Sequence, residues 1–175
     1  MILNAAAVDA KTLEAVRIHA ENELYVPALA SEVPALNGAD LPAIGKNAAE
    51  LKKPQDVCLI VLSGMNPKLT QHVAIMTKEQ VAVINVTALQ TSDPVQLTRR
   101  LQRVTLRGVA SLFGIGPDMD PRSVMCDYET LAELDKMGLN FSPPWMDMVR
   151  EAAAKRGLKV RPAFPPPPVA PATAK

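Results

Sequence analysis

The side chains that most often hold a metal or carry catalysis are few in this chain and far apart. The 175 residues include the histidines His19 and His72 and the cysteines Cys58 and Cys126. A zinc site needs several such ligands on one point, and neither histidine forms a ligand motif with its neighbours. We therefore interpret both histidines as surface or hydrogen-bonded residues, Cys58 as a core residue, and predict no metal and no cofactor.

Basic side chains gather on one predicted helix, from 94 to 113. We interpret Arg99, Arg100 and Arg103 as a solvated helix face paired with nearby acids, rather than as a phosphate or nucleic-acid site. The whole chain carries 19 basic and 18 acidic side chains. This balance favours neither a nucleic acid nor an anionic membrane as partner, so we predict neither.

Short apolar runs alternate with amphipathic segments along the chain, which predicts an α/β fold with a mixed sheet. The segment 56–63 is apolar on both faces, as in a central parallel strand. Further strands are expected in 1–8 and 29–34, and a β-hairpin at 72–86. Helices are expected after Asp9, at 46–52, at 94–113, at 128–137 and at 142–156.

The long helix 94–113 has two apolar faces toward its end. One stripe docks on the sheet and consists of Leu97, Leu101, Val104, Gly108 and Leu112. Leu106 and Phe113 lie opposite this stripe. We therefore expect the chain after Pro117 to pack over the end of the helix.

The segment RVTLRGVASLFGIGPDMDPRSVMCDYETL, from Arg103, resembles the catalytic segment of a metzincin metallopeptidase, HExxHxxGxxH followed by a Met-turn. In that motif two histidines share one helical face, a glycine allows a sharp turn and a third histidine closes the zinc site. Gly114 stands at the glycine position and Met125 at the Met-turn. The three histidine positions and the glutamate position are taken by Arg107, Ser111, Pro117 and Gly108.

The archaemetzincins are the metzincin branch that this chain resembles most. They add a second zinc site made of cysteines, and here those positions are occupied by Asp118, Ser123 and, approximately, Ser142 and Trp145 in FSPPW. The resemblance covers roughly residues 1–150, because the opening strand, first helix, central strand and hairpin follow in the same order.

This resemblance implies a metzincin-like three-layer sandwich with a mixed, mostly parallel twisted sheet, an edge hairpin and a long former active-site helix. It implies one domain over 1–161, with a sheet-containing part at 1–116 and a small C-terminal part at 117–161. Six of the 16 prolines follow in 162–175, which predicts a proline-rich flexible tail.

The replaced ligands predict a zinc-independent pseudo-peptidase. An arginine has no lone pair for a metal, and the glutamate that would act as general base is absent. Arg107 is expected either to fill the zinc void through a salt bridge with Asp118 or Asp120, or to anchor a partner's carboxylate. The former cleft, a possible partner-binding site, comprises Arg107, Gly108, Ser111, Gly114, Pro117, Asp118, Met125, Cys126 and Tyr128.

Three functions remain open at this stage. An extended peptide or protein could add to the edge at 72–86, or a partner could bind the tail 162–175. The chain could instead be a structural subunit of a larger assembly. Relocated enzyme chemistry near Cys126 or Tyr128 is the third possibility, although no histidine partner for the thiol is identifiable.

The sequence predicts a cytoplasmic location. The longest apolar run, near 57–64, is far shorter than the roughly 20 residues that a membrane span needs. The first residues, MILNAAAVDAK, lack the basic start of a secretory signal.

Overall fold

The computed structural model describes residues 1–64 and 70–161, so the tail predicted at 162–175 lies outside the described residues. One sheet has the strand order β2-β1-β3-β5-β4. The strands are β1 (Ile2–Ala5), β2 (Ala30–Glu32), β3 (Leu59–Ser63), β4 (Val73–Met76) and β5 (Val81–Asn85). All neighbours pair in parallel except β4, which is antiparallel to β5 and forms one edge. The mixed, mostly parallel sheet and its edge hairpin are confirmed.

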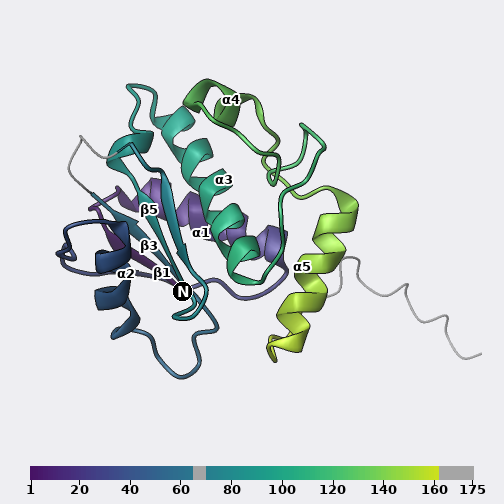
Figure 1. Ribbon diagram of the computed structural model, residues 1–175, viewed down its shortest axis with the longest axis horizontal. Helices are drawn as coiled ribbons and strands as arrows, with labels where there is room; N and C mark the ends of the chain where they lie inside the picture. Colours follow the sequence, from purple (N-terminus) through teal and green to yellow (C-terminus); the bar gives the residue numbers. More distant parts are fainter. Residues whose placement is uncertain (65–69, 162–175) are drawn as a thin grey trace, which may run out of the picture.

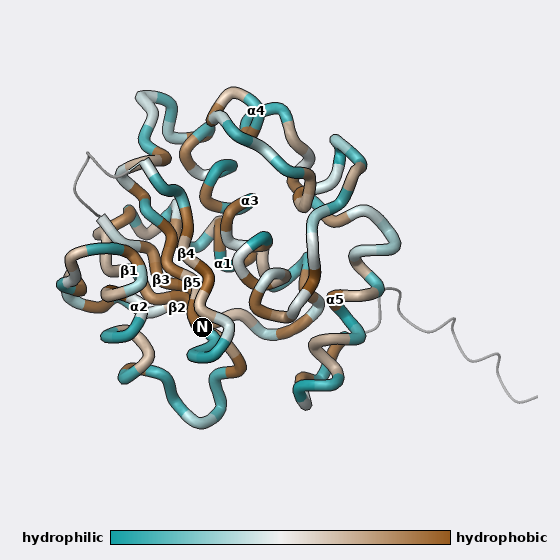
Figure 2. The backbone as a smooth tube through the Cα atoms, viewed as in Figure 1, coloured by the Kyte–Doolittle hydropathy of each residue, from teal (hydrophilic) through white to brown (hydrophobic). Residues whose placement is uncertain are grey.

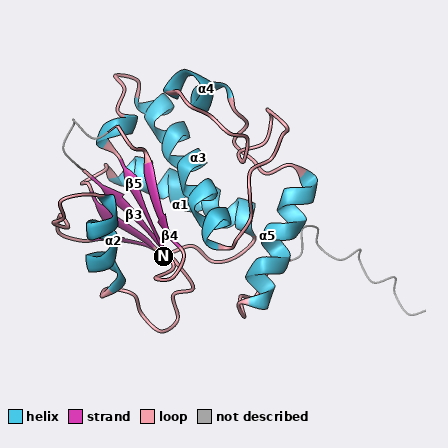
Figure 3. Ribbon diagram, in the orientation of Figure 1, coloured by secondary structure: helices cyan, strands magenta, loops and turns pink. Residues whose placement is uncertain are grey.

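Helices cover both faces of this sheet, as Figures 1 and 3 show. They are α1 (Ala10–Leu24), α2 (Leu41–Ala49), α3 (Pro94–Leu112), α4 (Leu131–Lys136) and α5 (Pro143–Lys155), with the short 3₁₀ helix η1 (Thr87–Leu89) before α3. α1 and α3 pack together on one face, and α2 covers the other. The fold is therefore an α/β sandwich of three layers.

The apolar core is divided by the sheet, because successive side chains of a strand point to opposite faces. In β3, Ile60 and Leu62 belong to the cluster shared with α1 and α3, while Leu59 and Val61 belong to the cluster shared with α2. In Figure 2 the strands at the centre of the fold are largely brown, the colour of hydrophobic residues. The expectation that 56–63 is a central strand buried on both faces is thus confirmed.

Two helices begin elsewhere than the sequence patterns indicated. α2 begins at Leu41 rather than at 46, because the Asp40 carboxylate accepts the amide of Ala43 and caps the helix. α4 begins at Leu131 rather than near 128, because Thr130 and Glu133 form a capping box there.

The predicted docking of α3 is confirmed. A Cβ atom built on Gly108 would lie 3.3 Å from both Ala82 Cβ and Ile60 Cδ1, so the helix backbone approaches the sheet closely at this residue. On the opposite side, Leu106 packs in the same apolar cluster as Val124 and Met125. The chain after Pro117 therefore covers the end of α3, as expected.

No helix within residues 1–64 and 70–161 is long and apolar enough to cross a membrane.

Candidate functional site

A sharp turn at the end of α3 builds the candidate site. Gly114 has a φ of +81°, a conformation that favours glycine, and the amide of Ile115 donates to the carbonyl of Ala110. This closing turn directs the following chain back along α3. It places the segment 124–128 beside Arg107.

Arg107 connects α3 to this returning segment. Its Nη1 donates to the carbonyl oxygens of Val124, at 3.1 Å, and Cys126, at 2.5 Å. Nη2 lies 3.5 Å from the exposed carboxylate of Asp127. The expected salt bridge to Asp118 or Asp120 is wrong. Backbone carbonyls accept from the guanidinium instead, while Asp118 accepts from Ser142 and Asp120 from Arg122.

Tyr128 and His72 extend the cluster to the sheet edge. The guanidinium of Arg107 lies 5.1 Å from the centre of the Tyr128 ring, and this ring stacks on His72 with a centroid separation of 5.7 Å. The Tyr128 hydroxyl lies 3.3 Å from Nδ1 of His72. We call these three side chains the Arg107–Tyr128–His72 cluster.

Burial shifts both titratable rings of the cluster toward their neutral forms. Burial lowers the pKa of His72, and the charge of Arg100 lowers it further. Burial likewise raises the pKa of Tyr128, against the opposing effect of Arg107. At neutral pH the imidazole and phenol are therefore both uncharged, and the cluster holds one permanent charge, on Arg107.

The four positions that would hold a catalytic zinc and its base do not fit that ion. Arg107 has no lone pair, and its donors are already occupied. Gly108 faces the sheet rather than the cleft, so it does not belong to the predicted cleft surface. Of the other two, Ser111 is half-buried and Pro117 is exposed. Neither supplies an imidazole or carboxylate.

The positions that would hold the cysteine zinc site form a network of oxygen atoms instead. The Oγ of Ser142 donates to the Asp118 carboxylate at 2.5 Å. Burial alone would raise the pKa of Asp118, but hydrogen bonds from Ser142, the Asp120 amide and Ser123 outweigh it and lower the pKa. Trp145 Nε1 donates to the carbonyl of Gly116 at 2.9 Å. In the described part of the chain, no three His, Cys, Asp or Glu residues are grouped to hold a metal.

Two arginines of α3 are placed differently from the prediction. Arg99 is exposed as expected, whereas Arg100 and Arg103 are only 6% and 5% exposed. Arg100 forms a bidentate pair with Asp135, at 2.8 and 2.6 Å. Arg103 donates to the carbonyl of Met137 at 2.7 Å. Arg100 therefore pairs with a nearby acid as predicted, but neither side chain is solvated, because the segment 135–138 closes over both.

The remaining candidates are single side chains. Nε2 of His19 lies 3.0 Å from the carbonyl of Leu139, and Cys58 is buried in the core, both as interpreted from the sequence. Met125 is buried as well. Cys126 is half-buried, and its Sγ lies 3.6 Å from the carbonyl of Asp127. In the described part of the chain, this thiol makes no hydrogen bond to a side chain that could act as its base.

Sequence comparison and structure comparison differ sharply for this chain. No family model and no curated protein matches the sequence. Archaemetzincin from Methanopyrus kandleri superimposes with a TM-score of 0.73 at 15% identity, over 87% of this chain and 93% of that one. The chain has an archaemetzincin-like fold.

Two further structures agree. A zinc-dependent peptidase from Methanocorpusculum labreanum has a TM-score of 0.71 at 16% identity, over 85% of this chain and 98% of that one. Archaemetzincin from Archaeoglobus fulgidus, complexed with malonate, has a TM-score of 0.65 at 12% identity, over 84% and 98%. The archaemetzincin-like fold thus extends over most of the chain.

The sequence pattern missed one part of the site. His72 was interpreted singly, whereas the structure places its ring on Tyr128, 56 residues later. The order of the elements could have indicated this contact. His72 precedes the edge strand β4 and Tyr128 follows the Met-turn, and both segments lie beside α3 in a metzincin-like fold.

Proposed function

We propose that this chain is a catalytically inactive archaemetzincin-like protein that binds a peptide or protein segment in extended conformation. The observation that carries the proposal is the edge strand β4 beginning at the Arg107–Tyr128–His72 cluster, where the positions for zinc ligands carry other side chains. The scaffold thereby retains a strand edge suited to binding and lacks the groups suited to cleavage.

The absence of cleavage follows from the chemistry of the replaced residues. Peptide hydrolysis on this scaffold uses a metal-activated water and a general base. Arg107 repels a cation, and Gly108 has no side chain that could take a proton. Placing a zinc ligand at residue 107 or a glutamate at residue 108 would also disturb packing. Arg107 donates to two backbone carbonyls, and Gly108 lies against the sheet.

The outer edge of β4 supports the binding role. The amide of Asn85 donates to the carbonyl of His72, and β4 pairs Ala74 with Val83. By the alternation of an antiparallel ladder, the amide and carbonyl groups of Val73 and Ile75 point away from β5. One of these groups, the Val73 carbonyl, accepts a bond from the side chain of Gln71. An added strand would pair with the others.

A peptide selection on the full chain tests this function. Peptides enriched from a random library are measured for affinity against the wild type and Ile75→Pro. Proline removes the outward amide of residue 75 while leaving the bonds to β5 in place. We expect Ile75→Pro to bind the peptides about tenfold more weakly than the wild type. This factor corresponds to about 1.4 kcal/mol, the contribution of one hydrogen bond.

Two controls keep the outcome interpretable. Ile75→Val retains the amide and should bind within about twofold of the wild type. Val73→Pro, at the first strand residue, where proline is tolerated, provides a second edge variant if Ile75→Pro unfolds. Equal affinity of a folded proline variant, or cleavage of the selected peptides by the zinc-supplemented chain, would refute the proposal.

A further inference from the structure

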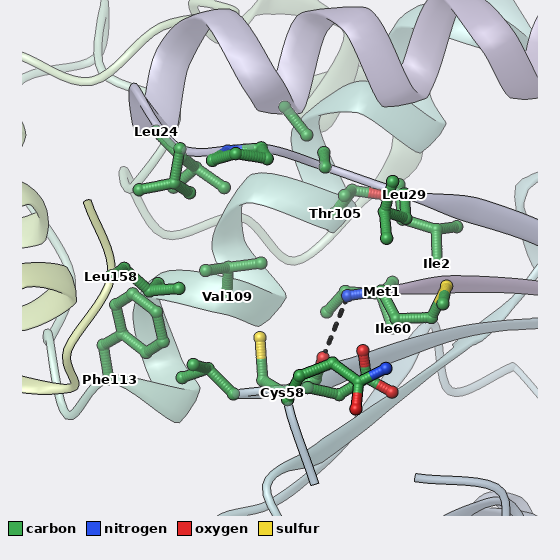
Figure 4. Close-up of a pocket in the computed structure, with 17 residues that line it drawn as sticks. Met1, Ile2, Leu24, Leu29, Cys58, Ile60, Thr105, Val109, Phe113 and Leu158 are labelled. Atoms are coloured by element: carbon green, nitrogen blue, oxygen red, sulfur yellow. Dashed lines mark hydrogen bonds between the residues drawn. The ribbon is translucent and has the colours of Figure 1, made fainter. Parts of the chain in front are cut away.

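A cavity lies on the far side of α3 from Arg107. Residues 105, 109 and 113 are separated from residue 107 by about half a turn of the helix. They line a space of about 220 Å³ between α1, α3 and the strands β1 and β3. Figure 4 shows Leu24, Ile60, Val109, Phe113 and Leu158 around it. The lining is mostly aliphatic, and none of these residues belongs to the proposed peptide site.

One polar group in this lining lacks a partner within the described residues. Thr105 is 1% exposed, and its Oγ1 has no hydrogen-bond partner there. Leaving a buried hydroxyl unpaired costs about 1–3 kcal/mol, so such groups need an explanation. Figure 4 places the hydroxyl among the side chains that surround the cavity. A ligand with one hydrogen-bonding group would satisfy it.

The charges around the cavity favour a neutral ligand. Among the side chains of its lining, Asp56 is the one that carries a charge, and its Oδ2 accepts the amide of Lys53. The N-terminal ammonium of Met1 belongs to the same lining and donates to the carbonyl of Cys58 at 3.1 Å. These two opposite charges offset one another, so the lining favours neither an anionic nor a cationic head group, and burying a further charge there would be costly.

The cavity is open to solvent at a rim on the surface. Leu29 is 58% exposed, Gln55 is exposed, and Leu158 is half-buried. All three belong to the lining. A ligand can therefore enter between the segment before β2 and the chain after α5.

We propose that this cavity binds a small, neutral, mainly apolar molecule of about ten non-hydrogen atoms that exchanges one hydrogen bond with Thr105. The size follows from comparison with a cavity of about 150 Å³, which binds benzene. The apolar part of the ligand would pack against the aliphatic lining, and its single polar group would form a hydrogen bond with Oγ1 of Thr105. A monocyclic phenol or a short alcohol has this chemistry.

Two probes that differ in one hydroxyl test the site on the full chain. 4-Ethylphenol and ethylbenzene are titrated separately and followed by NMR chemical shifts of the residues that line the cavity. We expect both to bind, with 4-ethylphenol about fivefold to twentyfold tighter, the range for one hydrogen bond. In Thr105→Val that preference should vanish while ethylbenzene still binds. Replacing an unpaired hydroxyl by a methyl group of the same shape should leave the melting temperature unchanged or raise it.

A filled cavity gives the matched control. Val109→Phe adds side-chain volume from α3 and should abolish binding of both probes. Ala20→Leu fills the same space from α1 and is the alternative variant if Val109→Phe destabilises the chain. Failure of the folded wild type to bind either probe, or unchanged binding in a folded filled variant, would overturn the proposal. An unchanged preference for 4-ethylphenol in Thr105→Val would overturn the role of Thr105.

Discussion

Arg107 holds together the two parts of the chain that form the candidate site. Removing its guanidinium in Arg107→Ala leaves the carbonyls of Val124 and Cys126 without their donor. We expect a loss of about 2–3 kcal/mol in the free energy of unfolding, measured by urea denaturation, because hydrogen bonds from a charged group are strong. Arg107→Lys should recover part of this loss.

Arg99 provides the control for Arg107, since it lies on the same helix and is exposed. Arg99→Ala should change stability by less than about 0.5 kcal/mol. An equal effect of the two alanine variants would show that Arg107 does not link α3 to the segment 124–126.

Asp135 gives a prediction about pH. The pKa of Asp135 is held below its usual value, chiefly by the hydrogen bonds from Arg100. A carboxyl whose pKa is lowered by folding contributes stability above its unfolded pKa, about 3.9, and loses it as the pH falls through the folded pKa. Asp135→Asn should therefore cost about 1–3 kcal/mol at pH 7. The difference from the wild type should shrink below pH 4 in urea titrations. A pH-independent difference would contradict this.

Among single residues, the sequence predicted those whose role depends on local chain geometry. Gly114 was assigned to a turn, and it has the positive φ that such a turn requires. The burial of Arg100 and Arg103 was not predictable in the same way. Spacing shows that they share a helix face, but not that carbonyls near 135–138 lie over it.

At the scale of elements, the contact of α3 with the sheet depends on the small size of residue 108. A glutamate at Gly108 would meet Ala82 and Ile60 and bury an unpaired carboxylate. We expect Gly108→Glu to lower the free energy of unfolding by more than about 3 kcal/mol, measured by thermal and urea denaturation.

Val95 offers a matched position for the same new charge. It is 58% exposed in the first turn of α3, where a carboxylate is favourable beside the helix N-terminus. Val95→Glu should be neutral or slightly stabilising. Similar destabilisation by both glutamates would mean that close packing at residue 108 is not the cause.

The long helix α3 and the central strand β3, which have strong periodic patterns, were predicted correctly. Asp93 and Pro94 begin α3 as expected, and β3 is the central buried strand. The start of α2 was missed, because the stretch through Pro34 and Pro42 has no clear periodicity and Pro42 lies in the first turn of the helix, where proline is tolerated.

At the scale of the whole molecule, the chain has an archaemetzincin-like fold although its sequence lacks the zinc ligands of the HExxHxxGxxH motif. Solved archaemetzincin structures superimpose over most of the chain at 12–15% identity. The two apolar clusters on either side of the sheet explain this, because a core tolerates exchange among apolar residues of similar volume. In a metzincin peptidase the zinc ligands form the recognisable sequence motif. In this chain other residues stand at those positions, so the order of the elements and a few spaced residues such as Gly114 and Met125 are what indicates the fold.

The most direct test is the zinc content of the purified full chain, measured by elemental mass spectrometry after incubation with zinc and desalting. Melting curves in zinc and in chelator accompany it. We expect far less than one zinc per chain and the same Tm in both, because Arg107, Ser111 and Pro117 offer neither imidazole nor carboxylate. Stoichiometric zinc, with a Tm that falls in chelator, would contradict the proposal that this archaemetzincin-like chain acts without a metal.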